Sequence, residues 1–488
     1  MTTHRTKLTS MQTDRAVGAI VASAAADALG APYEFHPPLA DGVPVRLHAG
    51  GGWDLGEWTD DTSMAIPILE ELAAGASLDD PETLHRIGRQ WRTWAGTAKD
   101  VGIQIRRVLS TAPGASESEL RATAEQVHRS TGRSAGNGSL MRTGPVALGL
   151  LHADDATLAA AARRLSDLTH FEDDAGDACV LWSLAIRHAI LEGAFDVRSG
   201  ITALPEERRT LWSERFDVAE RTAHPKDIPG SNGWVVAAIQ AAWCALTHST
   251  TLQEAIELAV RSGNDTDTVA AITGSLAGAR WGRSAVPAAW LRHLHGWPGQ
   301  TVDDLVRSAV LATRRGVAGE NGWPAAARWP VSGLPATLVV HPHDDGVLLG
   351  DLTALDTLAE DGTGPRVDAV VSLCRVGREQ VPAFIGARTA VWLVDQDGSN
   401  ADPAGVLADA ADSVAAYRAE GLTVLVHCFE GRSRTPSVGA AYSVRHLGIP
   451  ADQALQEVSA VLPRARPARF LAQAVHAVEP AGTGASDL

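Results

Sequence analysis

Residues 263–268 read GNDTDT and stand directly before an apolar run, VAAITGSLAGA, at residues 269–279. Alanine lowers the entropic cost of helix formation and lets helices pack closely, so this run predicts a buried helix that begins at the acidic cluster. The sequence TDDT at residues 59–62 stands in the same way before the apolar run at residues 64–69. The chain therefore predicts two helices that each begin with several carboxylates and hydroxyls.

Residues 11–295, which contain both clusters, are rich in Ala and show helical periodicity. The predicted helices cover residues 17–29, 64–73, 158–165, 177–191, 233–246, 252–260 and 269–279. No strand-like alternation of polar and apolar residues separates them, so we expect one all-α domain. Asp27 interrupts the apolar run near the N-terminus, which favours a helix of the folded protein over a signal peptide.

The rest of the chain changes character twice. Residues 296–335 are rich in Pro and Gly and predict a connecting segment, in which residues 302–313 can form one more helix of the first domain. Residues 336–480 alternate short β-rich runs with helical stretches, which predicts an α/β domain with a helix-covered sheet. The predicted strands are 337–340, 346–350, 369–373, 390–394 and 423–426, and the predicted helices are 405–420, 437–447 and 451–461.

The composition excludes several classes of protein. Asp and Glu number 58 against 42 Lys and Arg, a net charge of −16, so neither non-specific nucleic-acid binding nor attachment to an anionic membrane is expected. Four cysteines without a C-x-x-C pair argue against a disulfide scaffold and a structural zinc site. No apolar run reaches about 18 residues, so no membrane span is expected. We therefore expect a cytoplasmic protein.

The two acidic clusters have two explanations. Asp and Thr side chains commonly cap helix N-termini, and one such residue suffices for each helix. Four carboxylates and several hydroxyls exceed that need, and if the two helix ends met, the carboxylates would repel one another unless a cation neutralised them. Oxygen ligands without His or Cys select Mg²⁺ or Mn²⁺. From the spacing alone, capping and metal binding both remain open.

Further motifs occur around the clusters in a fixed order. They are DALG at residues 27–30, Glu34, TDDT at 59–62, GNGSLMR at 136–142, TH at 169–170 and GNDTDT at 263–268. In this order they resemble the ADP-ribosylglycohydrolase family of all-α enzymes, which use two Mg²⁺ ions to cleave ADP-ribose from acceptors. The resemblance covers residues 11–295 and favours metal binding over capping alone.

The resemblance implies a role for each matching residue. The ligands of two Mg²⁺ ions, or of Mn²⁺ in their place, would be Thr59, Asp60, Asp61, Asp265, Asp267 and Thr268. Glu34 would lie on a flap over the metals, and Asp100 matches the position where bacterial members hold an acceptor arginine. The residues lying against ADP-ribose would be Gly136, Asn137, Gly138, Ser139 and, on the diphosphate side, His170. Taken singly, the glycine-rich segment could be only a turn and the histidine only a packed side chain.

A second candidate site lies in the predicted α/β domain, where residues 427–436 read HCFEGRSRTP. They connect a predicted strand to a predicted helix, so loop N–H groups and the helix N-terminus would converge on one anion. In that field the Cys428 thiol would ionise near neutral pH, and Arg434 could grip a tetrahedral oxyanion. A thiolate, an anion cradle and an arginine suit phosphoryl transfer to sulfur, whereas a cysteine taken alone would be structural.

This stretch resembles the cysteine phosphatases of the dual-specificity type, over residues 336–480. The resemblance implies that Cys428 is the nucleophile and that Arg434 binds the phosphate. The hydroxyl that follows, on Thr435, would ease the departure of the thiolate.

A phosphatase of this kind also needs a general acid, because the leaving oxygen must be protonated. The family places an Asp upstream of the cysteine, after a strand, and Asp395 fits this position better than Asp397. Cys374 ends another predicted strand, and it is either a disulfide partner for Cys428, as in some relatives, or merely buried.

Together the two sites predict a bifunctional hydrolase. The first domain would use Mg²⁺ to remove ADP-ribose from a modified acceptor, such as a protein arginine. The second would hydrolyse phosphomonoesters through a phosphocysteine intermediate, so the expected partners are ADP-ribosylated and phosphorylated substrates, above all proteins. The alternative is that one domain is a non-catalytic module that binds ADP-ribose or phosphate and regulates the other.

Overall fold

A computed structural model describes residues 7–481 apart from residues 41, 331–332, 334 and 361–362. The chain forms two compact units. Unit 1 contains the described residues up to 286 together with residues 293–317, and unit 2 contains residues 287–292 together with those from 318 onward.

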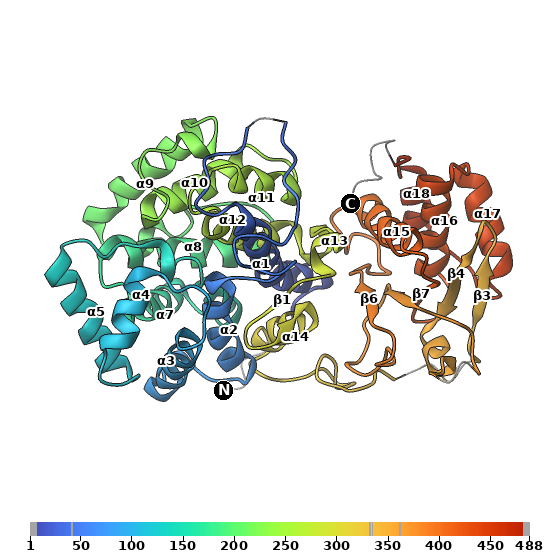
Figure 1. Ribbon diagram of the computed structural model, residues 1–488, viewed down its shortest axis with the longest axis horizontal. Coiled ribbons are helices and arrows are strands. Elements are labelled where there is room, and N and C mark those ends of the chain that lie inside the picture. The colour runs from blue at the N-terminus through green and yellow to red at the C-terminus, as the bar shows by residue number, and fades with distance from the viewer. Residues whose placement is uncertain (1–6, 41, 331–332, 334, 361–362, 482–488) are drawn as a thin grey trace. The chain divides into compact units, whose positions relative to one another are not determined.

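Unit 1 is helical, as the sequence predicts (Figure 1). Its α-helices are α1 (Ser10–Gly30), α2 (Asp60–Ala73), α3 (Pro81–Ala95), α4 (Ile103–Thr111), α5 (Glu117–Thr131), α6 (Gly144–Gly149), α7 (Asp155–Asp167), α8 (Asp173–Glu192), α9 (Glu206–Arg221), α10 (Val235–Thr247), α11 (Leu252–Val260), α12 (Thr266–Trp281) and α14 (Val302–Ala312). Two short strands, β1 (His295–Gly296) and β2 (Gln300–Thr301), pair antiparallel between α12 and α14.

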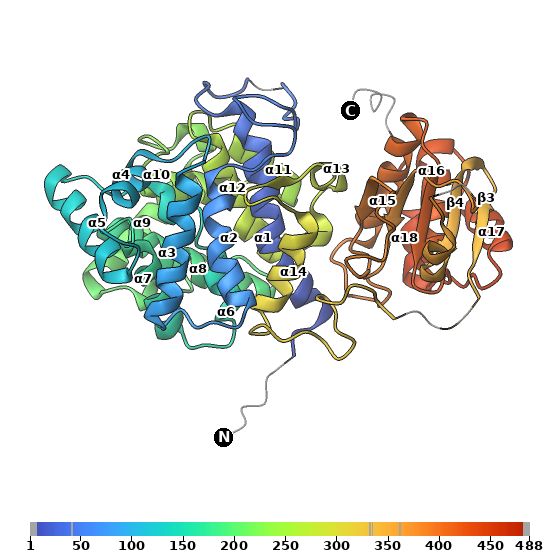
Figure 2. The ribbon, with the colours of Figure 1, turned by 60° about the horizontal axis from the view of Figure 1, so that its bottom comes forward.

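Helices α1 and α12 lie side by side in the interior of unit 1 (Figure 2). Small residues allow the close approach, because a Cβ at Gly278 would overlap the carbonyl oxygen of Gly18. The length and apolar character of α1 would also suit a membrane span, but 89% of its most apolar window is buried inside the fold. The same packing joins the end of α1 to the start of α12, since a Cβ at Gly30 would lie 2.5 Å from Asp267 Cα.

Unit 2 contains a five-stranded sheet in the order β3-β4-β7-β5-β6. Its strands are β3 (Leu338–His341), β4 (Asp344–Asp351), β5 (Ala369–Ser372), β6 (Ala387–Ala390) and β7 (Val424–Cys428). Strand β3 pairs antiparallel with β4, and the other neighbouring pairs are parallel. The helices of the unit are α13 (Ala288–Leu291), α15 (Pro403–Ala419), α16 (Arg434–Leu447), α17 (Ala451–Val461) and α18 (Arg469–His476). This is an α/β architecture.

Strand β7 is buried on both faces of the sheet. Val424, Val426 and Cys428 belong to a core formed with α15, α16, α17 and α18, whereas Leu425 belongs to a smaller core on the opposite face. Successive side chains of a strand point to opposite faces, so a run of apolar residues is what a strand buried on both faces requires. The strand therefore delivers Cys428 to the start of the loop that leads into α16.

The predicted strand at residues 390–394 is wrong in position, because β6 ends at Ala390. The Val391 N–H still donates to the Ser372 carbonyl at 2.9 Å, but Ser372 is the last residue of β5. Beyond that point the described residues offer no ladder partner, so the apolar residues that follow do not continue the strand. Asp395 consequently lies five residues after β6 rather than directly at its end.

The boundary between the units differs from the sequence prediction in two neighbouring segments. Pro287–Arg292, expected in the first domain, groups with unit 2, where the Ala288 N–H donates to Asp409 Oδ1 at 2.8 Å. Residues 293–317, mostly expected in the connecting segment, instead group with unit 1 and include α14.

Candidate active sites

The two acidic helix starts meet in unit 1. One oxygen each of Asp27, Asp61 and Asp267 lie within 4.8 Å of one another, and so do one oxygen each of Glu34, Asp265 and Asp267. Asp267 belongs to both groups, so the two groups adjoin. The end of α1, the start of α2 and the start of α12 supply these carboxylates, together with the segment that follows α1.

Asp27 caps helix α2 from outside that helix. Its Oδ1 accepts the Thr59 N–H at 2.9 Å, and its Oδ2 accepts the Thr62 N–H at 3.0 Å and the Thr62 hydroxyl at 2.6 Å. Burial raises the pKa of Asp27 to about 6 even though these three donors favour the ionised form. Because Asp27 already satisfies the N-terminus of α2, the helix does not need its own carboxylates as caps.

Asp61 and Asp267 face each other across the two helix starts. Thr59 Oγ1 lies 3.2 Å from Asp61 Oδ2 and 3.4 Å from Asp267 Oδ2, and Thr268 Oγ1 lies 3.3 Å from Asp61 Oδ2. All four residues are buried. The other oxygen of Asp61, Oδ1, is buried without a hydrogen-bond partner among the described residues.

The electrostatics of this cluster are unfavourable in the absence of a cation. Burial and the neighbouring carboxylates raise the pKa of Asp61 and of Asp267 well above the ordinary value. Burial also raises the pKa of Asp265, although Asn137 Nδ2 donates to its Oδ2 at 2.8 Å. Like charges held this closely disfavour each other's ionised form, which is what a divalent cation would reverse.

Asp60, Glu34 and Asp100 surround the two groups. Burial and Asp100 raise the pKa of Asp60 to about 7, and burial and Asp265 raise that of Glu34 to about 8. Asp100 is exposed, and its charge acts on Asp60, Glu34 and Asp265. Asp60 belongs to neither group of three that could hold an ion.

The donor set fits a hard divalent cation. Neither Thr59 nor Asp265, the residues preceding α2 and α12, makes a side-chain capping bond to its helix. Capping therefore does not account for the carboxylates, and the unpartnered Asp61 Oδ1 lies within a set of carboxylate and hydroxyl oxygens. Oxygen ligands of this kind are those that Mg²⁺ and Mn²⁺ prefer.

The glycine-rich turn adjoins the acidic cluster and His170. Asn137 Nδ2 donates to Asp265 Oδ2 at 2.8 Å, which ties the turn to the start of α12. A Cβ at Gly136 or at Gly138 would lie 3.3 Å from His170 Nε2, so the two glycines allow the ring to pack directly against the turn. The structure thus brings together all the residues predicted from this motif except the side chain of Ser139.

Ser139 and His170 have partners in the interior. Ser139 Oγ accepts a hydrogen bond from Ser166 Oγ at 2.9 Å, so the Ser139 side chain is committed to the core. His170 Nδ1 lies 2.8 Å from Thr169 Oγ1. Burial and the nearby Arg142 cation lower the pKa of His170 well below its ordinary value, which keeps the ring neutral.

Asn232 is a site residue that sequence reasoning missed. Its Nδ2 donates to the Gly263 carbonyl at 2.8 Å, its Oδ1 accepts the Asp265 N–H at 3.3 Å, and its carbonyl accepts Asn137 Nδ2 at 2.9 Å. It therefore fixes the loop before α12 and the glycine-rich turn at once. The only sequence signal was the turn-forming tripeptide SNG at residues 231–233, which does not report a distant partner.

Unit 2 holds the second candidate site around Cys428. A cavity of about 720 Å³ is lined by Asp395, Cys428, Phe429, Glu430, Arg432, Ser433, Arg434, Arg466, Pro467, Ala468 and Arg469. The Cys428 side chain is nearly buried, with 2% of the residue exposed. The loop from β7 to α16 thus places the thiol at a cavity wall, where the helix N-terminus also points.

Asp395 and Arg434 lie beside each other in this cavity. Ser433 Oγ donates to Asp395 Oδ1 at 2.8 Å, and Arg434 Nε lies 3.8 Å from Asp395 Oδ2. Arg434 Nη1 donates to the carbonyls of Leu373 and Leu393 at 2.8 Å and 3.2 Å. These bonds hold one edge of the guanidinium, while the buried Nε makes no hydrogen bond to the described residues.

Two neighbours of Cys428 have partners other than the sulfur. The Thr435 hydroxyl, which was predicted to ease the departure of the thiolate, donates to the Gly350 carbonyl at 3.0 Å and not to the sulfur. His427 Nε2 lies 2.7 Å from Ser372 Oγ, and burial lowers the pKa of His427 to about 4, which keeps it neutral.

Cys374 is a free cysteine packed against the same core as Cys428. Burial raises the pKa of Cys374 to about 12, while Arg434 opposes this shift and Cys428 adds to it. A thiol in this state is a poor nucleophile at neutral pH. A disulfide between the two cysteines therefore remains only a prediction.

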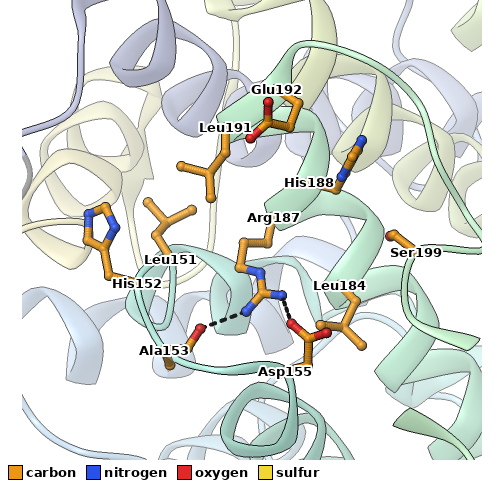
Figure 3. A pocket seen from close by; sticks show the side chains of 10 residues that line it. All are labelled: Leu151, His152, Ala153, Asp155, Leu184, Arg187, His188, Leu191, Glu192 and Ser199. Atoms are coloured by element: carbon orange, nitrogen blue, oxygen red, sulfur yellow. Dashed lines mark hydrogen bonds and ion pairs between the residues drawn. The ribbon is translucent and has the colours of Figure 1, made fainter. Parts of the chain in front are cut away.

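A separate cavity of about 410 Å³ lies in unit 1 (Figure 3). Arg187 reaches across it, donates to the Ala153 carbonyl at 2.8 Å and pairs with Asp155. None of the predicted metal or ADP-ribose residues lines this cavity. It is therefore distinct from the acidic cluster.

A family model described as ADP-ribosylglycohydrolase matches residues 8–320, which is more than half of the chain. The chain belongs to the ADP-ribosylglycohydrolase family.

Individual relatives agree with this assignment. The ADP-ribosylarginine hydrolase Tri1 of Pseudomonas putida (strain GB-1) is 31% identical over 57% of this chain and 73% of its own length. The ADP-ribosyl-[dinitrogen reductase] glycohydrolase of Rhodospirillum rubrum is 30% identical over 58% of this chain and 90% of its own length. Human ADP-ribosylhydrolase ARH3 is 24% identical over 51% of this chain and 77% of its own length.

Two solved structures are similar to parts of the chain. A structure described as an ADP-ribosylglycohydrolase-related protein complex is 28% identical, covers 63% of this chain and all of its own, and gives a TM-score of 0.46. Human DUSP28 is 25% identical, covers 30% of this chain and 95% of its own, and gives a TM-score of 0.26.

Proposed function

We propose that unit 1 is a divalent-metal-dependent hydrolase that removes ADP-ribose from arginine side chains of proteins. The observation that carries the proposal is the buried, unpartnered Asp61 Oδ1 within a set of carboxylates whose mutual repulsion a divalent cation would relieve. Two relatives whose names state the removal of ADP-ribose from arginine or from dinitrogen reductase support the substrate class.

The residues that would hold Mg²⁺, or Mn²⁺, are Thr59, Asp60, Asp61, Asp265, Asp267 and Thr268. Asp61, Asp265 and Asp267 belong to the two groups of carboxylates that could hold an ion, and Asp27 and Glu34 complete those groups. Bound there, the ions would orient the ribose and polarise a water molecule. Two ions would match the two adjoining groups of carboxylates.

The protein groups around the acidic cluster would position the substrate. The glycines of the turn leave its N–H groups open to a close phosphate, and Asn137 fixes this turn relative to Asp265. Neutral His170 would support the turn without adding charge. Asp100 is exposed near the cluster, so its carboxylate can pair with the guanidinium of the acceptor.

Release of ADP-ribose from an ADP-ribosylated arginine peptide tests this proposal. We expect hydrolysis with Mg²⁺ or Mn²⁺, none with excess EDTA, and full recovery when the metal is restored. Asp100→Ala should raise KM about tenfold or more for the arginine peptide, since one charge-assisted bond is lost, and should leave a serine-linked ADP-ribose peptide unaffected. Failure to release ADP-ribose with either metal would contradict the proposal.

We further propose that unit 2 hydrolyses phosphomonoesters. Cys428 Sγ would attack phosphorus and form an S–P bond while the P–O bond to the leaving group breaks and Asp395 protonates that oxygen. Water would then attack phosphorus, give its proton to Asp395 and release phosphate and the thiolate. Arg434 would hold the equatorial oxygens. The support is the meeting of thiol, guanidinium and carboxylate at one cavity.

A non-catalytic anion-binding role for unit 2 is the second candidate function. The bond from Thr435 to Gly350 favours it, because the hydroxyl proton is not directed at the sulfur. Binding of phosphate without turnover would establish this role.

A cytoplasmic location of the whole chain also remains a prediction.

A further inference from the structure

The cavity beside Cys428 carries more positive charge than one phosphate group needs. Four guanidinium groups line it, those of Arg432, Arg434, Arg466 and Arg469, against two carboxylates, those of Asp395 and Glu430. The whole chain has a net charge of −16, so the excess of positive charge around this cavity is opposite in sign to the charge of the chain as a whole. Arg434 and the loop N–H groups suffice for the reacting phosphate.

Arg466 and Arg469 come from a different part of the chain than the cysteine loop. They lie in the segment between α17 and α18, and at the first residue of α18. The Arg466 N–H donates to the Arg432 carbonyl at 2.6 Å, and the Ala468 N–H donates to Ser433 Oγ at 3.1 Å. Two hydrogen bonds therefore fix this segment against the loop that follows Cys428.

The two arginines are free to bind a ligand. Both are exposed, and among the residues that the structure describes neither has an acidic group at ion-pair distance. Arg464, two residues earlier, differs because it pairs with Asp351 and donates to Thr337 Oγ1 at 2.7 Å. Arg464 thus has a structural partner, whereas Arg466 and Arg469 face the cavity without one.

We propose that Arg466 and Arg469 form a second anion subsite, so that the substrate of unit 2 is a small phosphomonoester carrying a second phosphate or diphosphate group. This inference rests on the proposed phosphatase function of the same cavity. The volume of about 720 Å³ supports a small molecule, because it lies within the range of about 300–1,000 Å³ that is usual for small-ligand sites. Phe429 and Pro467 add apolar surface for the body of such a ligand.

The test compares two nucleotides that differ only in the second phosphate, adenosine 3′-monophosphate and adenosine 3′,5′-bisphosphate. Their dissociation constants are measured by calorimetry on the full-length Cys428→Ser chain, which binds without turnover. We expect the bisphosphate to bind at least about tenfold more tightly, which corresponds to about 1.4 kcal/mol. Adding Arg466→Ala and Arg469→Ala should reduce this ratio to about one, whereas adding Arg378→Ala, at an exposed arginine outside the cavity, should leave it unchanged.

Equal affinity for the two nucleotides, or an equal loss for both in the arginine variants, would overturn the second subsite. The same ratio of affinities is measured for a doubly and a singly phosphorylated form of one peptide. A larger ratio for the peptide than for the nucleotides would overturn the assignment to a small molecule. Hydrolysis of p-nitrophenyl phosphate by the wild-type chain is measured separately. If the bisphosphate binds more tightly but p-nitrophenyl phosphate is not hydrolysed, the second anion subsite is supported and the phosphatase mechanism is rejected.

Discussion

Asp61→Asn is expected to abolish the stabilisation of the chain by Mg²⁺ and to reduce ADP-ribose release by more than about a hundredfold. In the wild-type chain, Mg²⁺ at one hundred times its Kd should stabilise the fold by about 2.7 kcal/mol relative to EDTA. Without metal, the variant should be at least as stable as the wild type, because one of the mutually repelling carboxylates has lost its charge. Thermal unfolding with Mg²⁺ and with EDTA measures both effects.

Asp14→Asn provides a matched control for this prediction. Like Asp61, Asp14 is a buried carboxylate, but it lies in α1. It accepts hydrogen bonds from the Ser284 N–H at 3.0 Å and from the Ser284 hydroxyl at 2.5 Å. Its replacement should lower the unfolding temperature while the Mg²⁺-dependent increase persists. A full Mg²⁺ response in Asp61→Asn would contradict the assignment of Asp61 as a metal ligand.

Cys428→Ser is expected to reduce phosphomonoester hydrolysis at least about a thousandfold, because loss of a covalent nucleophile removes the whole two-step route. The rate of ADP-ribose release should stay within about twofold of the wild type, since the substitution lies in the other unit. Phosphate release from p-nitrophenyl phosphate and ADP-ribose release from an arginine peptide measure the two rates on one preparation.

Cys244→Ser serves as the control, because Cys244 is a buried free cysteine of unit 1. It should leave phosphate release unchanged. Phosphate release by Cys428→Ser at more than about a tenth of the wild-type rate would contradict the phosphocysteine mechanism.

The core helices were predictable from sequence, and the surface helices were not. Helix α11 matches its predicted range, and α1, α8 and α12 extend beyond theirs at both ends. Each has a middle dominated by Ala and larger apolar residues, which is what the sequence pattern detects. Helix α9 was missed since its buried residues are few, Trp212, Phe216 and Ala219, among many charged ones. The same mixture of charged and apolar residues hid α3 and α5.

The sequence showed which residue types the candidate metal site contains, but not that the two acidic helix starts come together. Each cluster stands at a helix start, where capping explains it equally well until the partner of each carboxylate is known. In the structure the cap of α2 comes from Asp27, a residue 32 positions before Thr59. No local pattern reports such a contact, and the same holds for Asn232 and for the arginines beside Cys428.

The most direct test of the central claim is an anomalous difference map from crystals of the full-length chain soaked in Mn²⁺. The account predicts anomalous peaks within coordination distance of Asp61 Oδ1 and of the Asp265 and Asp267 carboxylates. A well-ordered acidic cluster without any peak, with Mn²⁺ present in the crystal, would contradict the proposal that these helix ends come together to hold metal ions.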